Sequence, residues 1–289
     1  MIGPGFSGDS VVQGGSTGAA RARSVWMLLT LSGAATACVG LCSTGLCEEA
    51  DRPQLAGTWS GPTQMLDDEA WAFEDFACFL GCPSETFAFA RRLFGDPANF
   101  DRSYPELQGE VIRRRAADMV AKLTPAALEL RQAFDPADDP AIRCQPYGLV
   151  RQALSPVPIE IIQANDAVTI RYELWSAVRV ISLGGNSAEP AAPTRLGRSV
   201  GRYEDEALVV ETTGVLGDVV APDARVLHSS DLRAIERYTL ADNGDRLDLE
   251  LTVTDPKTFS EPLTLRAAWR RTPRTRLLPY ECHVIGEPP

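Results

Sequence analysis

The 289-residue sequence is poor in the residues and motifs that usually reveal an activity. It has only two histidines, His228 and His283, and neither stands at zinc-ligand spacing from a cysteine, so we expect no metal site. The formal net charge is -11 and no basic run exceeds Arg113–Arg115, which argues against a nucleic-acid interface. Gly184-Gly185 lacks the spacing of a phosphate-binding loop. We therefore expect no metal, no cofactor and no nucleic-acid partner.

The sequence also lacks a nucleophile motif in the structural setting that such a motif needs. Ser199 stands in Gly197-Arg-Ser-Val-Gly201, which formally matches the Gly-x-Ser-x-Gly motif of hydrolases. That motif needs a strand before the serine and a helix after it. Here the residues after Ser199 alternate as a strand does, so the sequence argues against a serine hydrolase.

One apolar run stands out, near the N-terminus. Residues 1–20 are rich in glycine and serine without periodicity, which predicts disorder. Arg21 and Arg23 then precede an apolar run that ends in Ala35-Thr36-Ala37, the pattern of a secretory signal peptide. The run is short for a membrane span, an uncleaved anchor is the alternative, and Ala37-Cys38 weakly resembles a lipoprotein cleavage site. We predict export to the periplasm or the medium, with membrane contact only through this segment.

Cysteine usage agrees with export. The body of the chain contains Cys78, Cys82, Cys144 and Cys282. Four cysteines in an exported chain suggest disulfides, and they can pair in three ways. We favour Cys144–Cys282, which would join the start of the β region to its last strand, together with a local Cys78–Cys82 bond. Residues four apart on a helix suit a disulfide poorly, which argues against the local bond.

The chain divides into a leader over residues 1–47 and one domain over residues 48–289. Apolar residues at helical spacing, with capping residues and proline at helix starts, predict a helical flank or lid over residues 67–134. The expected helices are 69–80, 85–94, 104–122 and 124–134.

The rest of the domain, residues 144–284, has the alternation and turn signals of strands. Asn165-Asp166 and Asn243-Gly244 are hairpin turns. An earlier strand at residues 55–61 carries Gly57-Thr-Trp59, which resembles the opening of lipocalin-like barrels, where the tryptophan plugs the closed end. The other expected strands are 159–163, 168–175, 178–183, a pair within 201–214, 232–240, 246–254, 263–270 and 277–282. About nine or ten sequential antiparallel strands curl into a barrel or a strongly curved sheet, with a two-sheet sandwich as the alternative. The fold class is mainly β with a helical segment (α+β).

Much of the sequence after residue 124 resembles a family of uncharacterised exported bacterial proteins. The matching segments are Asp135-Pro136, Asp139-Pro140, Cys144–Arg151, Pro158–Gln163, Tyr172-Glu173, Gly197–Tyr203, Leu208–Gly214, His228–Asp231, Glu236-Arg237, Asp255–Lys257 and Tyr280–Cys282. Tyr203 stands where members usually carry tryptophan, and the acidic turn after it lacks their usual glycine. The family has no established activity, so the resemblance implies export and a lipocalin-like barrel rather than a chemistry.

If the β region is a barrel, the polar residues on its inward faces are the candidate site. Side chains alternate along a strand, so each candidate is identified by the apolar residues that share its face. The candidate catalytic residues are Glu211, Glu236, Arg179, Tyr172 and, on the loop before the Glu236 strand, His228. The candidate ligand-binding residues are Gln163, Trp59 and Tyr238.

These residues support more than one function. A carboxylate among apolar neighbours and an arginine has a shifted pKa and can act as an acid or a base, but Arg179 and one glutamate can equally form a structural pair, which we favour for any single residue. The first hypothesis is a protein that binds a small apolar or amphipathic molecule in the barrel. The second is a metal-independent isomerase, lyase or cyclase. The third is a cell-envelope interaction protein without a cavity. An interior filled by side chains would argue against the first two.

Overall fold

The structure is a computed structural model that describes residues 52–62, 71–184 and 192–284. The predicted leader over residues 1–47, with its signal sequence and Cys38, lies outside the described residues. Within the described ranges, no helix is long and apolar enough to cross a membrane.

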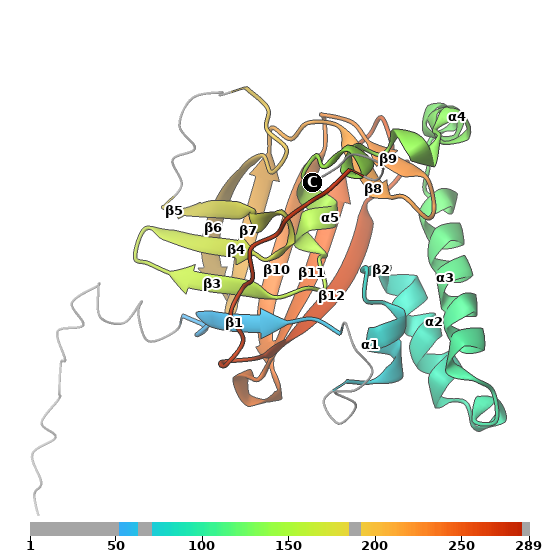
Figure 1. Ribbon diagram of the computed structural model, residues 1–289, viewed down its shortest axis with the longest axis horizontal. Coiled ribbons are helices and arrows are strands. Elements are labelled where there is room, and N and C mark those ends of the chain that lie inside the picture. The colour runs from blue at the N-terminus through green and yellow to red at the C-terminus, as the bar shows by residue number, and fades with distance from the viewer. Residues whose placement is uncertain (1–51, 63–70, 185–191, 285–289) are drawn as a thin grey trace, which may run out of the picture. The chain divides into compact units, whose positions relative to one another are not determined.

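A closed β-barrel forms most of the domain, as the sequence predicts (Figure 1). Its nine strands, in their order around the barrel, are β1 (Gly57–Ser60), β3 (Ile159–Gln163), β4 (Ala167–Tyr172), β5 (Val178–Leu183), β6 (Arg198–Glu204), β7 (Ala207–Thr213), β10 (Arg233–Ala241), β11 (Arg246–Thr254) and β12 (Leu263–Arg271). The short strand β1 pairs with both β3 and β12, and this closes the barrel. The closing ladder is short, because only Trp59 and Ser60 pair with β12.

One strand pair departs from the predicted antiparallel order. β5 and β6 pair in parallel, with Ile181 opposite Ser199 and Leu183 opposite Gly201. Parallel neighbours cannot be joined by a tight turn, because the chain must return to the end at which the first strand began. The segment between Leu183 and Arg198 makes this return. The expectation of a purely antiparallel barrel is therefore wrong at this position.

The predicted hairpin turns are confirmed. The two-residue loop Asn165-Asp166 joins β3 to β4, and Ala164 N donates to Ala167 O across it. In the acidic turn between β6 and β7, Asp205 and Glu206 have φ values of 46° and 61°. Positive φ at both central residues gives the turn a twist that matches the strands it joins.

A helical flank lies beside β12, and its helices are close to those predicted except for the first, which is much shorter than the predicted helix over 69–80. They are α1 (Phe73–Ala77), α2 (Ser84–Gly95), α3 (Tyr104–Ala121) and α4 (Pro125–Ala133). The Thr124 hydroxyl accepts a hydrogen bond from Ala127 N and caps α4, while Pro125 occupies the first turn. Arg115 of α3 is buried, and its guanidinium binds the Gly81 carbonyl and Asp223.

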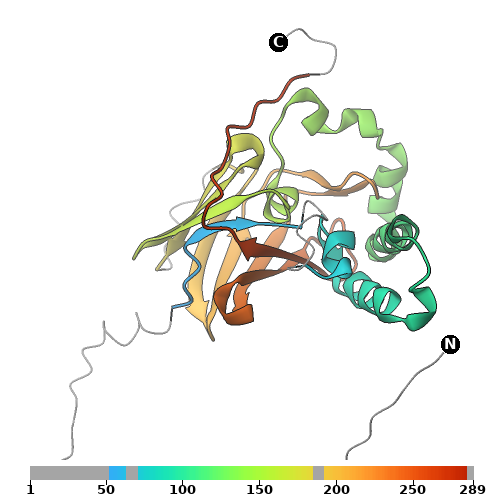
Figure 2. The same cartoon turned by 60° about the horizontal axis from the view of Figure 1, so that its bottom comes forward.

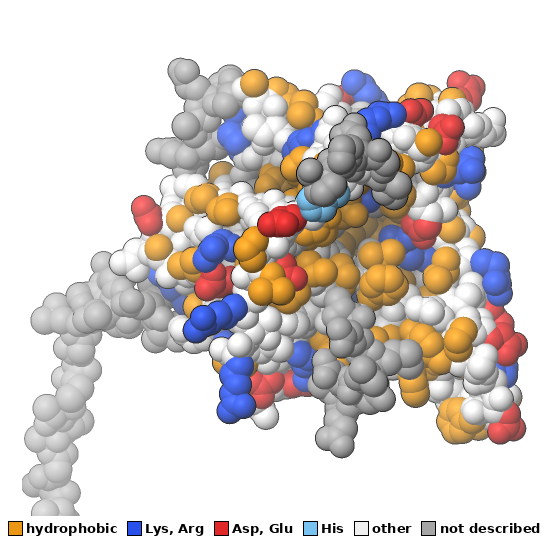
Figure 3. All heavy atoms as spheres, viewed as in Figure 1, with side chains coloured by type: hydrophobic (Ala, Val, Ile, Leu, Met, Phe, Trp, Pro, Cys, Tyr) orange, Lys and Arg blue, Asp and Glu red, His pale blue; other side chains and the backbone are white. Residues whose placement is uncertain are grey.

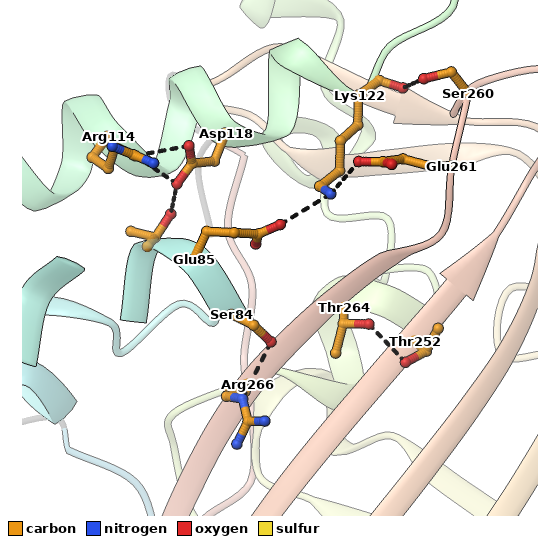
Figure 4. Close-up of polar contacts among 11 residues, drawn as sticks. Ser84, Glu85, Arg114, Asp118, Lys122, Thr252, Ser260, Glu261, Thr264 and Arg266 are labelled. Atoms are coloured by element: carbon orange, nitrogen blue, oxygen red, sulfur yellow. Dashed lines mark hydrogen bonds and ion pairs between the residues drawn. The ribbon is translucent and has the colours of Figure 1, made fainter. Parts of the chain in front are cut away.

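Polar contacts attach the flank to the barrel (Figure 4). Lys122 Nζ lies 3.0 Å from the Glu85 carboxylate of α2 and 2.6 Å from that of Glu261, just before β12. Arg266 of β12 donates to Ser84 Oγ at 3.2 Å. The strand β2 (Cys82–Pro83) also pairs with β12. The helical segment is thus a flank that packs beside β12 and also reaches β11, where Arg246 binds Asp75 of α1.

Both predicted disulfides are present. Cys78 and Cys82 have Cα atoms 5.3 Å apart, and those of Cys144 and Cys282 are 5.6 Å apart. The local bond forms because α1 ends at Ala77, so the two cysteines do not share a helix; the chain turns at Gly81, which has φ of 77°.

The predicted last strand, 277–282, is wrong. These residues are extended but pair with no strand, and Figures 1 and 2 show the segment (red) running past the barrel strands. The backbone N–H groups of Leu278 and Tyr280 bind the side chains of Glu173 and Ser176. With the Cys282 disulfide, these contacts hold the segment without a ladder.

Three short elements were not predicted. The helix α5 (Leu149–Ala153) belongs to the same hydrophobic core as the barrel strands, and β8 (Asp218–Ala221) pairs with β9 (Val226–His228) in a separate two-stranded sheet. Short 3-10 turns also lie at Pro97–Asn99, Pro136–Asp138, Pro140–Arg143 and Leu174–Ser176. A further one, Asp242–Gly244, forms the hairpin turn predicted at Asn243-Gly244 and joins β10 to β11. On the face shown in Figure 3, hydrophobic side chains gather where α5 and β12 lie, and charged side chains surround them.

Candidate functional site

Two of the predicted site residues form a buried ion pair inside the barrel. Arg179 of β5 and Glu236 of β10 are only 3% and 0% exposed. Arg179 Nη1 donates to Glu236 Oε1 at 2.8 Å, and Nη2 contacts the other carboxylate oxygen. This bidentate geometry is the strongest arrangement for a guanidinium and a carboxylate.

Three more side chains complete the hydrogen bonding of this pair. Arg179 Nε donates to Ser199 Oγ at 2.9 Å, and Nη2 donates to Thr212 Oγ1 at 2.7 Å. The Tyr238 hydroxyl donates to Glu236 Oε1 at 2.8 Å, and the Ser199 and Thr212 hydroxyl oxygens lie 3.0 Å apart. We call these five residues the Arg179 network. Every donor nitrogen of its guanidinium has a partner.

The protonation states of this region suit a structural role. Burial raises the pKa of Tyr172 to about 12, and burial together with the Glu236 charge raises the pKa of Tyr238 well above its usual range. Burial alone would lower the pKa of Arg179, but the Glu236 carboxylate more than offsets this, and the net shift is upward. Near neutral pH the tyrosines therefore stay protonated and the arginine stays charged.

The barrel interior is filled by side chains. Its largest buried side chains include Trp59, Trp269 and Tyr238, which are 0%, 1% and 2% exposed. At Gly201 an added Cβ would lie 2.7 Å from Ile181 Cγ2, so even one methyl group would force the neighbouring side chains to shift. A cavity that admits a small molecule leaves accessible surface on the side chains that line it. The packed interior argues against a ligand site within the barrel.

Glu211 was predicted to face the interior, and this is wrong. It is exposed on the outer face of β7, opposite Val200 and Ile235, while Thr212 points inward. Alternation along β7 identifies two faces correctly, but both carry apolar residues, and Val209 on the outer face is only 5% exposed. Hydrophobicity alone could not show which face is the interior.

Trp59 and Gln163 hold the segment before β1 to the barrel. Trp59 Nε1 donates to Leu55 O at 2.9 Å, and the Arg271 guanidinium stacks over the Trp59 ring with its Cζ 4.2 Å from the centroid. Gln163 accepts from Ala56 N and donates to Pro53 O and to the Tyr203 hydroxyl. These contacts are internal to the fold, so neither side chain lines a ligand cavity.

His228 lies outside the barrel, at the end of β9. It is 5% exposed, and its Nδ1 lies 2.9 Å from the Ser229 carbonyl oxygen, while Nε2 is buried without a hydrogen-bond partner among the described residues. Burial lowers the pKa of His228. No hydrogen bond among the described residues joins His228 to the Arg179 network. The predicted site residues therefore do not form one cluster.

An apolar groove passes beside His228. We call it the α4–β9 groove. Its volume is about 710 Å³. The lining residues come from α4, from β9 and from the loop between β11 and β12: Leu123, Thr124, Pro125, Ala126, Ala127, Leu130, Leu227, His228, Ser229, Pro256, Lys257 and Thr258. Seven of these twelve residues are alanine, leucine or proline. The volume falls within the range of small-molecule sites, roughly 300–1,000 Å³.

Asp255 fixes the wall of this groove. Its carboxylate accepts hydrogen bonds from Ser229 N, Ser229 Oγ, Lys257 N and Thr258 Oγ1. These bonds tie the residue after His228 to the β11–β12 loop. Burial would raise the pKa of Asp255, but the hydrogen bonds outweigh it and lower the pKa.

A second groove, of about 420 Å³, lies against the outer face of β10–β12. It carries phenylalanines from the flank, but half of its ten strand residues are charged, and four of these five pair with other side chains. Arg246 binds Asp75 and Asp248, and Arg266 binds Glu250. The α4–β9 groove is therefore the more apolar of the two.

Comparisons with known proteins leave the resemblance described above as a prediction. No protein-family model matches the chain, and no curated protein is significantly similar to it. In the ranges that the structure describes, no three His, Cys, Asp or Glu residues gather as metal ligands would.

Sequence reasoning missed two parts of these sites. Ser199 and Thr212 were not expected to bind Arg179, although both alternate onto the inward faces of β6 and β7 with apolar neighbours. Asp255 was noted only as part of the Asp-Pro-Lys segment, and its partner Ser229 lies 26 residues earlier. An aspartate that begins such a turn is a frequent acceptor for nearby backbone N–H groups, and that signal could have identified it.

Proposed function

We propose that this protein is an exported, non-catalytic binding protein that takes up a small apolar or amphipathic molecule in the α4–β9 groove. The observation that carries the proposal is the groove itself: an open, largely apolar channel of about 710 Å³ beside a buried histidine. Leu130 on its rim is 64% exposed. Apolar surface left open in a concave site is typical of a place where an apolar ligand binds.

A binding role is better supported than catalysis. The charged groups and hydrogen-bond donors of the Arg179 network all bind one another. Glu211, the second predicted carboxylate, faces outward. The two catalytic carboxylates of the enzyme hypothesis thus do not meet. The ligand site that we propose lies at the surface, whereas the sequence suggested a site in the barrel interior.

The two disulfides support export. Cys144–Cys282 and Cys78–Cys82 are bonds of the kind that persist in oxidising compartments. Together with the predicted signal sequence, they favour the periplasm or the extracellular medium.

The proposal is tested with N-phenyl-1-naphthylamine, an uncharged apolar dye whose fluorescence rises in apolar surroundings. Wild-type protein should bind it at a single site. Ala126→Trp adds an indole at an exposed position on the groove lining and should weaken binding at least tenfold. Ala133→Trp, an exposed position at the other end of the same helix, is the matched control and should bind as wild type does.

If wild type and Ala126→Trp bind the dye equally well, the dye binds outside the α4–β9 groove. Absence of dye binding to the wild type, with no small molecule retained in native mass spectra of protein from its own host, would refute the proposed function.

A further inference from the structure

Among the described residues that line the α4–β9 groove, one buried side-chain polar atom has no hydrogen-bond partner, and it belongs to His228. Thr124 Oγ1 donates to Lys257 O at 2.8 Å, and the Ser229 and Thr258 hydroxyls donate to Asp255. The Lys257 ammonium lies 2.8 Å from an Asp231 carboxylate oxygen. These contacts occupy every other polar side chain of the lining. His228 Nε2 remains.

The partner of Nδ1 determines what His228 Nε2 can do. A backbone carbonyl oxygen accepts hydrogen bonds and cannot donate, so the 2.9 Å contact with Ser229 O places the proton on Nδ1. In a neutral imidazole, Nε2 then carries a lone pair and acts only as an acceptor. Burial favours that neutral form.

The charged groups near His228 are themselves occupied. Asp218, opposite His228 in the β8–β9 pair, binds Arg195 at 3.0 Å and accepts from Val219 N. Asp255 accepts from Ser229 and from the β11–β12 loop. Among the described residues, neither carboxylate forms a hydrogen bond with the imidazole. Nε2 therefore stays without a partner, and a bound molecule could supply one.

We infer that the ligand of the α4–β9 groove is an uncharged molecule with an apolar body and one hydroxyl group, which donates its hydrogen bond to His228 Nε2. This inference rests on the proposed function and specifies the ligand class. An alcohol satisfies a buried acceptor that otherwise has no partner. A carboxylate would face the lone pair of Nε2, and Lys257, the cation of the described lining, is already paired with Asp231. Since Nε2 is shielded from water, binding includes a small displacement of the side chains that cover it.

Three probes of equal chain length separate the alternatives. 1-Decanol has the donor, 1-methoxydecane lacks it, and decanoate carries a charge. Each is titrated against protein loaded with N-phenyl-1-naphthylamine, and the displacement constants are compared. We expect 1-decanol to bind about tenfold more tightly than the ether, which is the effect of one recovered hydrogen bond. Decanoate should bind more weakly than 1-decanol.

Replacement of the histidine provides the second readout. In His228→Phe the alcohol and the ether should bind equally, because the acceptor is gone while an aromatic ring of similar size remains. If that variant does not fold, His228→Leu replaces it, because leucine also lacks an acceptor, and the same equality of alcohol and ether is expected.

The outcomes distinguish this inference from the proposed function. Dye binding with equal displacement by alcohol and ether overturns the inference and leaves the proposed function standing. An alcohol preference that persists in His228→Phe places the donor contact elsewhere and also overturns it, as does tighter binding of decanoate. If neither the dye nor any probe binds wild-type protein, the proposed function itself fails.

Discussion

Replacing Glu236 by glutamine should destabilise the fold strongly. The substitution keeps the shape of the side chain and an acceptor for the Tyr238 hydroxyl but removes the charge that neutralises Arg179. Arg179 is 3% exposed, and its raised pKa keeps it protonated. Loss of one partner of a buried ion pair costs about 3–5 kcal/mol. For a domain of this size, that corresponds to a fall in Tm of roughly 6–20 °C.

The assay is urea unfolding followed by tryptophan fluorescence, with the disulfides intact. Glu211→Gln is the matched control, because it removes the same charge from a neighbouring strand at an exposed position. Its free energy of unfolding should change by no more than about 0.5 kcal/mol. The double variant Arg179→Met with Glu236→Gln should recover part of the loss, because no unpaired charge stays buried.

Two results would contradict this reasoning. If Glu236→Gln and Glu211→Gln unfold at the same urea concentration, the Arg179 network does not support the fold. If Glu236→Gln is as stable as wild type but no longer binds the dye, the network belongs to a ligand site and the barrel interior is not closed.

The remaining predictions concern the disulfides and Asp255. Replacing Cys144 and Cys282 by serine should cost about 2–5 kcal/mol of unfolding free energy, since this bond closes a long loop, with a sequence separation of 138. The same change at Cys78 and Cys82, whose separation is 4, should cost less; equal losses in urea would refute the loop-length argument. Asp255→Asn should lower stability near pH 7 by about 1–3 kcal/mol. The folded-state pKa of Asp255 is lowered, so its contribution is complete above the unfolded-state pKa, about 3.9, and disappears as pH falls through the folded-state value. The difference between wild type and variant should therefore shrink as the pH falls below the unfolded-state pKa, and a difference that grows in acid would contradict the assignment.

Local signals predicted the elements that form from neighbouring residues. The turn at Asn165-Asp166 and the acidic turn after Glu204 form hairpins as expected, since turn chemistry and strand alternation act over a few residues. The proline after Thr124 begins α4 as expected. The parallel pairing of β5 with β6 had no local signal, because the connecting segment reads only as a loop.

The site was predicted in part, for the same reason. Alternation placed Arg179 and Glu236 on inward faces, and they meet although 57 residues separate them. Alternation failed for Glu211, where both faces of the strand are apolar. It could not apply to His228, which lies on a hairpin that was read as a loop.

By itself, the sequence determined a mainly β chain with a helical flank and argued against the common nucleotide and nucleophile motifs. It favoured a barrel over a sandwich and two disulfides over the other pairings. These follow from composition, spacing and periodicity, which are properties of short segments. Only the tertiary structure decided that the barrel is filled, that the Arg179–Glu236 charges neutralise each other, and that His228 lines an apolar groove. Those outcomes depend on which distant surfaces pack together, and packing across the chain is not encoded in the spacing of neighbouring residues.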